Sequence, residues 1–494
     1  MFESVELGHR LSKRQYARQL PGLRTALLQA QHALVRAPVA VIVLVAGLDG
    51  AGKGQVVNRL TEWLDPRGVD TYTFWDPSDE ERERPRWWRF WRVLPAAGRI
   101  AVLFGGWYGD LLLDRVHGKI KRKTLDRELD RIVAFEQMLA AEGVVLVKLW
   151  FHLSKKGQRQ RLEELERSSA VHWRMLPRDW KHYKLYKQFL RAAERIIRRT
   201  NTAACPWHLI EALDDRYRDL TAGQVVLQAL EQAVSPGTRL PAQSPIAPVQ
   251  LNLPEPSKRT VLDKVDLSQR LSAAQYRCAL GKCQRKLNRL VWAAHDRGRS
   301  VVIVFEGWDA AGKGSSIRRL TEAMDARLYR VVPIAAPTDE EKAHHYLWRF
   351  WRHLPRAGRV TIFDRSWYGR VLVERVEGFA RPDQWSRAYL EINDFEEQLV
   401  EHGIVLIKFW LHISPDEQLR RFKQRQRIPY KQHKITAEDW RNRQKWAAYQ
   451  AAVNDMITRT STAAAPWTLV PANDKKFARI QILKTVCRRL AAAL

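Results

Sequence analysis

Apolar residues along this chain form short unbroken runs that alternate with helical stripes. The runs at 41–45 (Val-Ile-Val-Leu-Val) and 301–305 (Val-Val-Ile-Val-Phe) contain no polar residue, which is typical of a strand buried on both faces. Each run ends in glycines and is followed by a helical pattern, and a basic helical stretch precedes it, at 11–35 and at 267–296. We therefore predict a helix, a buried strand and a second helix at the start of each half.

Further apolar runs follow in the same order in both halves. They lie at 102–104, 144–148 and 208–210 in the first half and at 360–363, 404–408 and 468–470 in the second. Helical patterns separate them. Strands that alternate with helices favour a parallel sheet covered on both faces, so the predicted fold class is α/β.

The two halves are copies of one another. Gly47-Leu-Asp-Gly-Ala-Gly-Lys-Gly54 returns as Gly307-Trp-Asp-Ala-Ala-Gly-Lys-Gly314, an offset of 307 − 47 = 260, and the same offset maps Trp88-Arg-Phe-Trp-Arg92 onto Trp348-Arg-Phe-Trp-Arg352. An offset that holds along the chain indicates a tandem duplication. We predict a first repeat at 1–235, a proline-rich linker at 236–258 and a second repeat at 259–494.

Charge narrows the choice of partner. The net charge is +30 and the pI is about 10.2, which favours a polyanion such as nucleic acid, an anionic membrane surface or a phosphate polymer. The longest apolar run, 37–46, is too short to cross a bilayer. The chain start lacks the pattern of a signal peptide, and the cysteines show no metal-ligand spacing. We expect a cytoplasmic protein with no membrane partner.

The glycine-rich loop of the second repeat is a candidate phosphate site. In Gly307-x-x-x-x-Gly312-Lys313, glycines allow backbone N–H groups to close around phosphate oxygens, the following helix adds its positive end, and the lysine reaches the terminal phosphates. Gly314 stands where a P-loop has the Ser or Thr that binds Mg²⁺. Whether Ser315 reaches the metal instead is left open by the sequence, and Asp309 offers a carboxylate within the loop.

A second group of candidates follows a strand. Asp364 stands at the end of the run at 360–363, the usual place of a second Mg²⁺ ligand in P-loop enzymes. Arg365 and Arg370 flank it, and one of them could steady the oxygens of a transferred phosphoryl group. The alternatives are a carboxylate that caps the next turn and arginines of a solvated turn.

A basic stretch from Arg420 to Lys431, with Lys434 beyond it, is the third candidate. Arg421 and Arg425 share one helix face, and Arg427 follows. A basic helix that leads into a loop resembles a lid that closes over phosphates and excludes water. A plain solvated helix is the alternative, and it is favoured in the first repeat, which has Glu163, Glu164 and Glu166 in this stretch.

The Trp-Arg-Phe-Trp-Arg box occurs in both repeats. Interleaved aromatic and basic residues could stack on nucleic-acid bases. The tryptophans are three residues apart, however, as are the arginines, which favours a helix with one buried face and one charged edge.

Taken together, these motifs resemble the polyphosphate kinase 2 family. The resemblance rests on Gly307-x-Asp-x-x-Gly-Lys-Gly314, Pro337-Thr-Asp-Glu-Glu341, Phe363-Asp-Arg-Ser-Trp-Tyr-x-Arg370, the lid through Asp439-Trp440, and Asn473-Asp-Lys475. It covers nearly all of 267–490, and the first repeat matches more loosely. It implies tandem P-loop kinase-like domains, each a parallel sheet flanked by helices with a helical lid.

The resemblance also implies an activity and residue roles. The activity is phosphoryl transfer from inorganic polyphosphate to a nucleotide with Mg²⁺ as cofactor, and the fused two-domain form is associated with AMP as the acceptor that gives ADP. Asp309 and Asp364 would hold the metal, Lys313 would steady the transferred group, and Arg365, Arg421 and Arg425 would bind polyphosphate or the acceptor phosphate. The implied phosphate-binding set is Gly307, Gly312, Lys313, Gly314, Ser315, Arg370, Arg427, Lys431 and Lys434, and the implied nucleotide-binding set is Asn473, Asp474 and Lys475.

The first repeat departs from this pattern at the chemistry. It keeps Asp49 and Lys53, but Phe104 replaces Asp364, Gly105 replaces Arg365 and Asp110 replaces Arg370. Some members of the family carry an acid at the position of Asp110, so a shifted metal ligand stays open. We predict that the second repeat carries the activity and that the first is inactive or weak, with a role in packing or polymer binding.

Three other functions stay open at this point. One is phosphorylation of nucleoside diphosphates from polyphosphate, and another is an ATP-dependent nucleotide kinase of the same fold. The third is nucleic-acid binding through a relict P-loop, disfavoured because no nucleic-acid module is recognisable. The two repeats could pack as a pseudo-dimer within one chain, and a homo-oligomer is also open.

Overall fold

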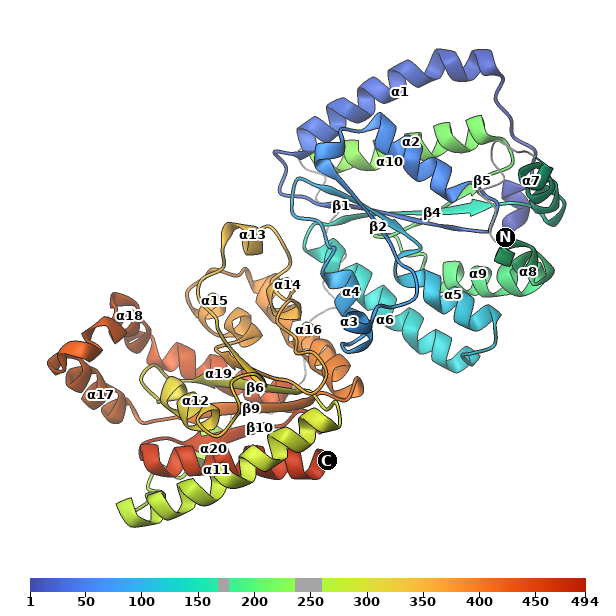
Figure 1. Ribbon diagram of the computed structural model, residues 1–494. Coiled ribbons are helices and arrows are strands. Elements are labelled where there is room, and N and C mark those ends of the chain that lie inside the picture. The colour runs from blue at the N-terminus through green and yellow to red at the C-terminus, as the bar shows by residue number, and fades with distance from the viewer. Residues whose placement is uncertain (168–176, 236–259) are drawn as a thin grey trace. The chain divides into compact units, whose positions relative to one another are not determined.

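The structure is a computed structural model that describes residues 1–167, 177–235 and 260–494 (Figure 1). The predicted linker at 236–258 lies outside the described residues. The chain divides into two compact units, Met1–Pro77, Arg89–Ser244 and Asp339–His345 in the first and Ser78–Trp88, Pro245–Thr338 and Tyr346–Leu494 in the second. Each unit is built mainly from one repeat, and the boundaries proposed at 235 and 259 stay a prediction.

The first repeat alternates strands with helices from its start. The helices are α1 (Lys13–Leu34), α2 (Lys53–Trp63), α3 (Asp79–Arg82), α4 (Trp88–Trp91), α5 (Gly109–Val116), α6 (Arg122–Ala141), α7 (Lys155–Arg167), α8 (Pro177–Lys184), α9 (Tyr186–Thr200) and α10 (Asp215–Val234). The strands are β1 (Val41–Gly47), β2 (Val69–Thr73), β3 (Ile100–Phe104), β4 (Val145–His152) and β5 (Trp207–Glu211).

The second repeat reproduces this order. Its helices are α11 (Ala273–Asp296), α12 (Lys313–Thr321), α13 (Asp339–Lys342), α14 (Trp348–Trp351), α15 (Val373–Val376), α16 (Pro382–Glu401), α17 (Pro415–Arg427), α18 (Ala437–Gln444), α19 (Trp446–Thr460) and α20 (Lys475–Ala493). Its strands are β6 (Val301–Gly307), β7 (Tyr329–Pro333), β8 (Val360–Asp364), β9 (Val405–His412) and β10 (Trp467–Pro471). The 3₁₀ turns η6 (Trp367–Val371) and η7 (Pro429–Lys434) follow β8 and α17.

Each repeat forms one five-stranded sheet, in the order β2-β3-β1-β4-β5 and, in the second, β7-β8-β6-β9-β10. The strand pairs of the second sheet are parallel, and the register places Phe305 beside Asp364 and Gly307 beside Leu411. β6 is central, and the chain crosses from its β8 side to its β9 side, which makes the carboxyl end of β6 the expected place for a ligand. The predicted α/β class with parallel sheets is confirmed.

Helices cover both faces of the second sheet, with α11, α12 and α20 on one face and α16 and α19 on the other (Figure 1). Val301, Val302, Ile303, Val304 and Phe305 are fully buried or nearly so, as the unbroken apolar run predicts. α17, η7 and α18 form the helical lid that follows β9.

Two strands escaped the sequence pattern. β2 and β7 are outer strands, and their residues alternate between more and less exposed positions instead of forming an apolar run. An outer strand faces solvent along one side and needs fewer apolar residues. Both strands become recognisable only when the sheet order is known and the repeat offset relates one to the other.

The Trp-Arg-Phe-Trp-Arg box is core, as its spacing favours. Trp348, Phe350 and Trp351 on α14 are 5%, 3% and 1% exposed. Trp351 packs edge-on against Phe395, with ring centroids 4.9 Å apart. These rings hold neighbouring elements together and are not free to stack on bases. Among the described residues, no helix is long and apolar enough to cross a membrane.

Candidate active site

The loop between β6 and α12 has the backbone of a phosphate cradle. Gly307 has a φ of 151°, and a Cβ there would lie 2.6 Å from the carbonyl oxygen of Leu411 on β9, so only glycine fits. Gly312 has a φ of 114° and precedes the first residue of α12. The N-terminus of α12 therefore points its free N–H groups into the loop.

Lys313 folds back over this loop. Its Nζ donates to the carbonyl oxygens of Gly307 at 2.7 Å and Trp308 at 3.3 Å. The ammonium is thus held at the mouth of the cradle, where a phosphate oxygen could take over one of these hydrogen bonds.

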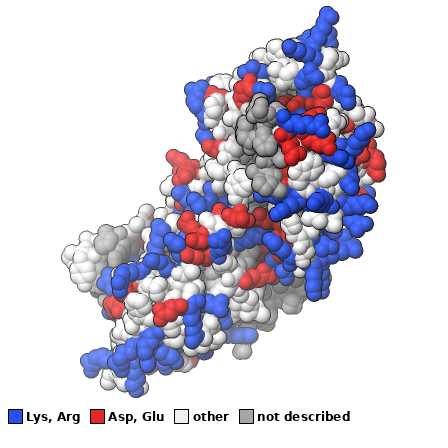
Figure 2. Space-filling model, turned by 45° about the vertical axis from the view of Figure 1, so that its right-hand side comes forward, with Lys and Arg blue, Asp and Glu red and all other residues white. Residues whose placement is uncertain are grey.

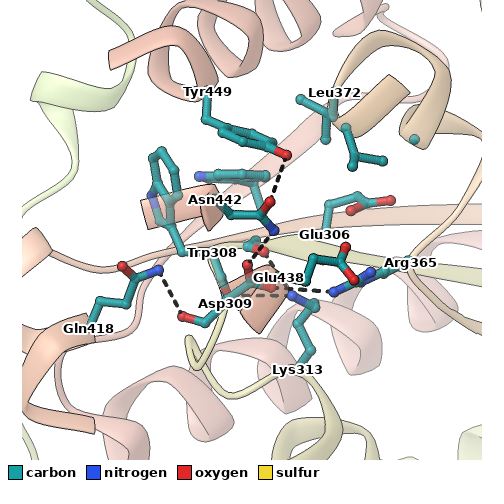
Figure 3. A pocket seen from close by; sticks show the side chains of 14 residues that line it. Glu306, Trp308, Asp309, Lys313, Arg365, Leu372, Gln418, Glu438, Asn442 and Tyr449 are labelled. Atoms are coloured by element: carbon teal, nitrogen blue, oxygen red, sulfur yellow. Dashed lines mark hydrogen bonds and ion pairs between the residues drawn. The ribbon is translucent and has the colours of Figure 1, made fainter. Parts of the chain in front are cut away.

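A cleft that opens to solvent lies above the loop (Figure 3). It is lined by Glu306, Gly307, Trp308, Asp309, Lys313, Arg365, Gly369, Leu372, Val373, Trp410, Gln418, Glu438, Asn442 and Tyr449. The loop after β6, the turn after β8 and the lid helices all contribute. Its apolar lining side chains are those of Trp308, Leu372, Val373 and Trp410.

Asp309 is held from three sides. Its Oδ1 lies 3.3 Å from a guanidinium nitrogen of Arg365, its Oδ2 accepts from the Asn442 amide at 3.0 Å, and its backbone oxygen accepts from Gln418 at 3.2 Å. Gln418 and Asn442 belong to the lid, on α17 and α18. Figure 3 shows Arg365 and Asn442 reaching the carboxylate of Asp309 and Gln418 reaching its backbone oxygen.

Asp364 ends β8 next to β6. A Cβ built on Gly314 would lie 3.9 Å from its Oδ2, so the carboxylate faces the start of α12. Among the described residues its side chain has no hydrogen-bond partner. No group of three or more His, Cys, Asp or Glu side chains that could hold a metal occurs in the described part of the chain. One or two carboxylates completed by water and phosphate oxygens are what Mg²⁺ prefers, so Asp309 and Asp364 fit this ion.

Arg365 occupies a strained backbone position. Its φ is 66°, a left-handed backbone conformation that residues other than glycine rarely adopt. Burial opposes the charged guanidinium, but the carboxylates of Asp309 and Glu306 outweigh it and raise the pKa of Arg365. The strain and the charge both indicate a side chain kept for function.

Sequence reasoning missed Glu306. It lines the cleft, is 6% exposed, and its Oε1 accepts from the Ser366 hydroxyl at 2.7 Å. Burial raises the pKa of this carboxyl. The available signal was a lone acid at the end of an otherwise apolar strand, replaced by Ala46 in the first repeat.

Arg421 was expected to bind a phosphate from the lid, but its guanidinium points into the protein. It is 2% exposed and donates to the carbonyl oxygens of Ala310 and Ala311 in the loop, at 2.9 and 2.8 Å. It also donates to the carbonyl oxygens of Ala472 and Asn473 and pairs with Glu417. With its donors taken by the protein, Arg421 fastens the loop to α17 and to the segment after β10.

Cations gather beside Arg421. The protein around Lys475 desolvates its ammonium, and Arg421, Arg425 and Arg479 repel it, which lowers the pKa of Lys475 to about 8. Mutually repelling cations in one place are stabilised when an anion binds between them.

The remaining candidates lie in other settings. Arg370 pairs with Glu374 at 3.2 Å and lies over the Tyr346 ring. Ser315 donates to the Gly312 carbonyl oxygen, the Asn473 side chain accepts from the Ser414 backbone, and Asp474 caps α20. Arg427 is exposed, and the side chains of Lys431 and Lys434 lie outside the described residues.

The first repeat has the same loop, but different side chains lie against it. The Arg218 guanidinium lies so close to Gly52 that a Cβ would not fit, is 1% exposed, and pairs with Asp215 and Asp219, each at 2.7 Å. Its equivalent in the second repeat is Ala478. Arg218 thus occupies space beside the first loop, and Asp215 brings negative charge where the second repeat has Lys475.

Asp49 of the first repeat is also engaged. Its carboxylate lies 2.6 Å from Nδ1 of His182 and 3.4 Å from Nζ of Lys53. Burial would raise its pKa, but Lys53 and His182 outweigh burial and lower it. Gly105, the equivalent of Arg365, keeps the left-handed turn with a φ of 78° and no strain.

Comparison with known proteins supports this architecture. The chain matches the family described as Polyphosphate kinase 2 (PPK2) over residues 10–236 and 270–494. It is 51% identical over 494 residues to the Polyphosphate:AMP phosphotransferase of Pseudomonas aeruginosa, covering 100% of this chain and 99% of that protein. It is 48% identical over 494 residues to the protein of the same name from Pseudomonas syringae pv. tomato, with the same coverage. A crystal structure described as polyphosphate kinase 2 from Pseudomonas aeruginosa PA01 superposes with a TM-score of 0.89 at 49% identity, covering 100% and 99% of the two chains.

Proposed function

Because this chain belongs to the polyphosphate kinase 2 family, we propose that it transfers a phosphoryl group from inorganic polyphosphate to AMP, giving ADP, and that the second repeat carries the reaction with Mg²⁺. The observation that carries the assignment to the second repeat is the convergence of Asp309, Lys313 and Arg365 on one cleft, with the Asp364 carboxylate facing the start of α12. The relatives of full length that are named polyphosphate:AMP phosphotransferase support the choice of AMP as acceptor.

The reaction breaks the terminal P–O–P linkage of the polymer and forms a new one to a phosphate oxygen of AMP. A loose phosphoryl-transfer transition state needs alignment and charge neutralisation more than covalent chemistry. The loop N–H groups, Lys313 and Arg365 supply positive charge around the transferred group. Mg²⁺ bound by Asp309 and Asp364 would neutralise phosphate charge and orient the reacting oxygens.

Substrate capture follows from charge. The chain carries a net charge of +30, and groups of Lys and Arg side chains occur across the face drawn in Figure 2, with acidic and neutral side chains between them. Such a surface attracts a polyanion over long distances, and the attraction weakens with salt. The cluster of Lys475, Arg425 and Arg479 would attract the polyanion at short range.

We infer a non-catalytic role for the first repeat. Phe104 and Gly105 remove the second carboxylate and the arginine, Arg218 fills space beside the loop, and His182 engages Asp49. Each change lowers the affinity of this loop for a metal-bound phosphate. The role inferred for the first repeat is therefore packing or polymer binding.

The first experiment follows ADP formation from AMP, long-chain polyphosphate and Mg²⁺. We expect the wild-type chain to form ADP and Asp364→Asn to lose at least about 100-fold in kcat, because one metal ligand is removed. The control variant Asp110→Asn, at the acid that could act as a shifted metal ligand in the first repeat, should keep activity. ADP formed only with ATP as donor would replace the proposal with an ordinary nucleotide kinase, and faster turnover of ADP than of AMP would indicate a nucleoside-diphosphate acceptor.

A further inference from the structure

The lid touches the metal-binding end of the cleft through a side chain with no assigned role. Asn442, on α18, donates from Nδ2 to Oδ2 of Asp309 at 3.0 Å. Figure 3 shows its amide between the carboxylate and the Tyr449 ring. The contact joins the lid to the carboxylate expected to hold Mg²⁺.

Tyr449 determines which way this amide faces. Its hydroxyl lies 3.2 Å from Oδ1 of Asn442 and 3.4 Å from Oε1 of Glu377. When the hydroxyl donates to the amide oxygen, the amide NH₂ must face Asp309, which only accepts. The amide is therefore oriented from behind, as the partners of metal ligands usually are.

Glu377 anchors the lid segment that carries Asn442. Its side chain is 5% exposed, and its Oε2 pairs with Lys445 at 2.8 Å and with Arg441 at 3.1 Å. Arg441 and Asn442 belong to α18, and Lys445 directly follows it. One buried carboxylate thus anchors α18 and, with it, the position of Asn442.

A neutral amide is a suitable hydrogen-bond partner for a carboxylate that binds a metal ion. It donates one hydrogen bond to Oδ2 and adds no charge, so the remaining lone pairs of Oδ2 stay available to a metal while Oδ1 faces Arg365. The first repeat has His182, Phe189 and His117 at the positions of Asn442, Tyr449 and Glu377. There the ring of His182 lies 2.6 Å from the Asp49 carboxylate, and the hydroxyl and the anchoring carboxylate are missing. This repeat also lacks the equivalent of Asp364.

We propose that Asn442, oriented by Tyr449 and held in place by the Glu377 anchor of α18, is a positioning residue for the Mg²⁺ site and couples the lid to the rotamer of Asp309. The inference rests on the proposed function for the identity of the metal. It predicts that lid contacts set metal affinity as well as substrate enclosure.

The test is Mn²⁺ binding to the full chain, followed by electron paramagnetic resonance without polyphosphate or nucleotide. We expect Asn442→Ala to weaken Asp309-dependent Mn²⁺ binding about 10- to 100-fold, the usual effect of losing a partner of a metal ligand. Tyr449→Phe should weaken it less, because the amide remains but loses its fixed direction. Asp309→Asn defines the signal that belongs to this site, and His182→Ala in the first repeat is the matched control, expected to leave that signal unchanged.

Kinetics separates positioning from direct contact with substrate. For Asn442→Ala we expect the Mg²⁺ concentration at half-maximal rate to rise by the same factor, with the KM for AMP within about twofold, and Asn442→Gln to recover part of the loss. Unchanged Mn²⁺ affinity in Asn442→Ala, or no Asp309-dependent signal in the wild type, overturns this inference. A missing polyphosphate reaction with intact, Asn442-dependent Mn²⁺ binding overturns the proposed function and leaves this inference standing.

Discussion

Two residues outside glycine have a positive φ in the described chain, and both stand beside the cleft. Ala310 has a φ of 62° and Arg365 of 66°, whereas the equivalent Gly50 and Gly105 have 80° and 78° without strain. A left-handed residue with a side chain costs on the order of 1–2 kcal/mol. In the second repeat the strained residue Arg365 places its guanidinium near Asp309. The first repeat has Gly105 there, which carries neither the strain nor the guanidinium.

Substitutions at Arg365 should separate strain from function. We expect Arg365→Gly to be more stable than Arg365→Ala by about 1 kcal/mol, because only glycine relieves the left-handed backbone. Both variants should lose about 100-fold or more in kcat, because both remove the same guanidinium. Chemical denaturation and steady-state rates give the two readings, and equal stability of the two variants would contradict the strain argument.

Lys475 gives a pH dependence at the residue scale. Its pKa is lowered to about 8, so the ammonium is charged at pH 7 and only about a tenth charged at pH 9. A lysine that holds the AMP phosphate should therefore raise the KM for AMP by up to about tenfold between these pH values. Lys475→Arg, which stays charged, should flatten the profile, and an unchanged slope in that variant would remove Lys475 from the phosphate contacts.

The turn after each third strand depends on a buried ion pair between elements. Lys408 on β9 donates to Glu396 on α16 at 2.6 Å, both at most 2% exposed, and to the Tyr368 hydroxyl and the Thr460 carbonyl oxygen. Trp367 also donates to Glu396, at 3.0 Å. The pair therefore fixes η6, and with it the direction of Asp364 and Arg365. Lys148 and Glu136 repeat the pair in the first repeat.

Breaking this pair should destabilise the second repeat strongly. Lys408→Met leaves the buried Glu396 carboxylate without its cation, which costs about 3–5 kcal/mol. That lowers the Tm of this repeat by roughly 6–20 °C for about 230 residues. The double variant Lys408→Met with Glu396→Leu should recover most of the loss in differential scanning calorimetry. A double variant no more stable than the single one would show that the pair is not the cause.

At the scale of the whole molecule, two similar loops are expected to contribute unequally. Lys53 and Lys313 both donate to the carbonyl oxygen of the first loop glycine, at 2.6 and 2.7 Å. Only the second loop faces Asp364, and only the first has an arginine, Arg218, pressed against one of its glycines, Gly52. The lysines therefore make the same contact with the loop glycine, while their surroundings differ.

Paired lysine variants test this asymmetry. We expect Lys313→Ala to lose about 100-fold or more in kcat and Lys53→Ala to stay within about twofold of wild type, because only Lys313 faces the transferred phosphoryl group. Steady-state ADP formation measures both. Loss of activity in Lys53→Ala alone would assign the reaction to the first repeat.

The sequence by itself determined the features that depend on local pattern. Apolar runs gave every strand except β2 and β7, the constant offset gave the duplication, and glycine spacing gave the loop of Gly307 to Lys313. These signals are readable because burial and left-handed turns restrict residue type at fixed positions. The replacement of Asp364 by Phe104 was equally visible, because the register between repeats is unbroken.

Only the tertiary structure decided how distant residues meet. It turned Arg421 inward to loop carbonyls, placed Asn442 on Asp309, brought Glu306 into the cleft and put Arg218 beside Gly52. A charged residue in a sequence has no direction, and whether a guanidinium meets a ligand or a carbonyl oxygen depends on partners more than 100 residues away. Direction and partner are properties of packing, and packing exists only in the folded chain.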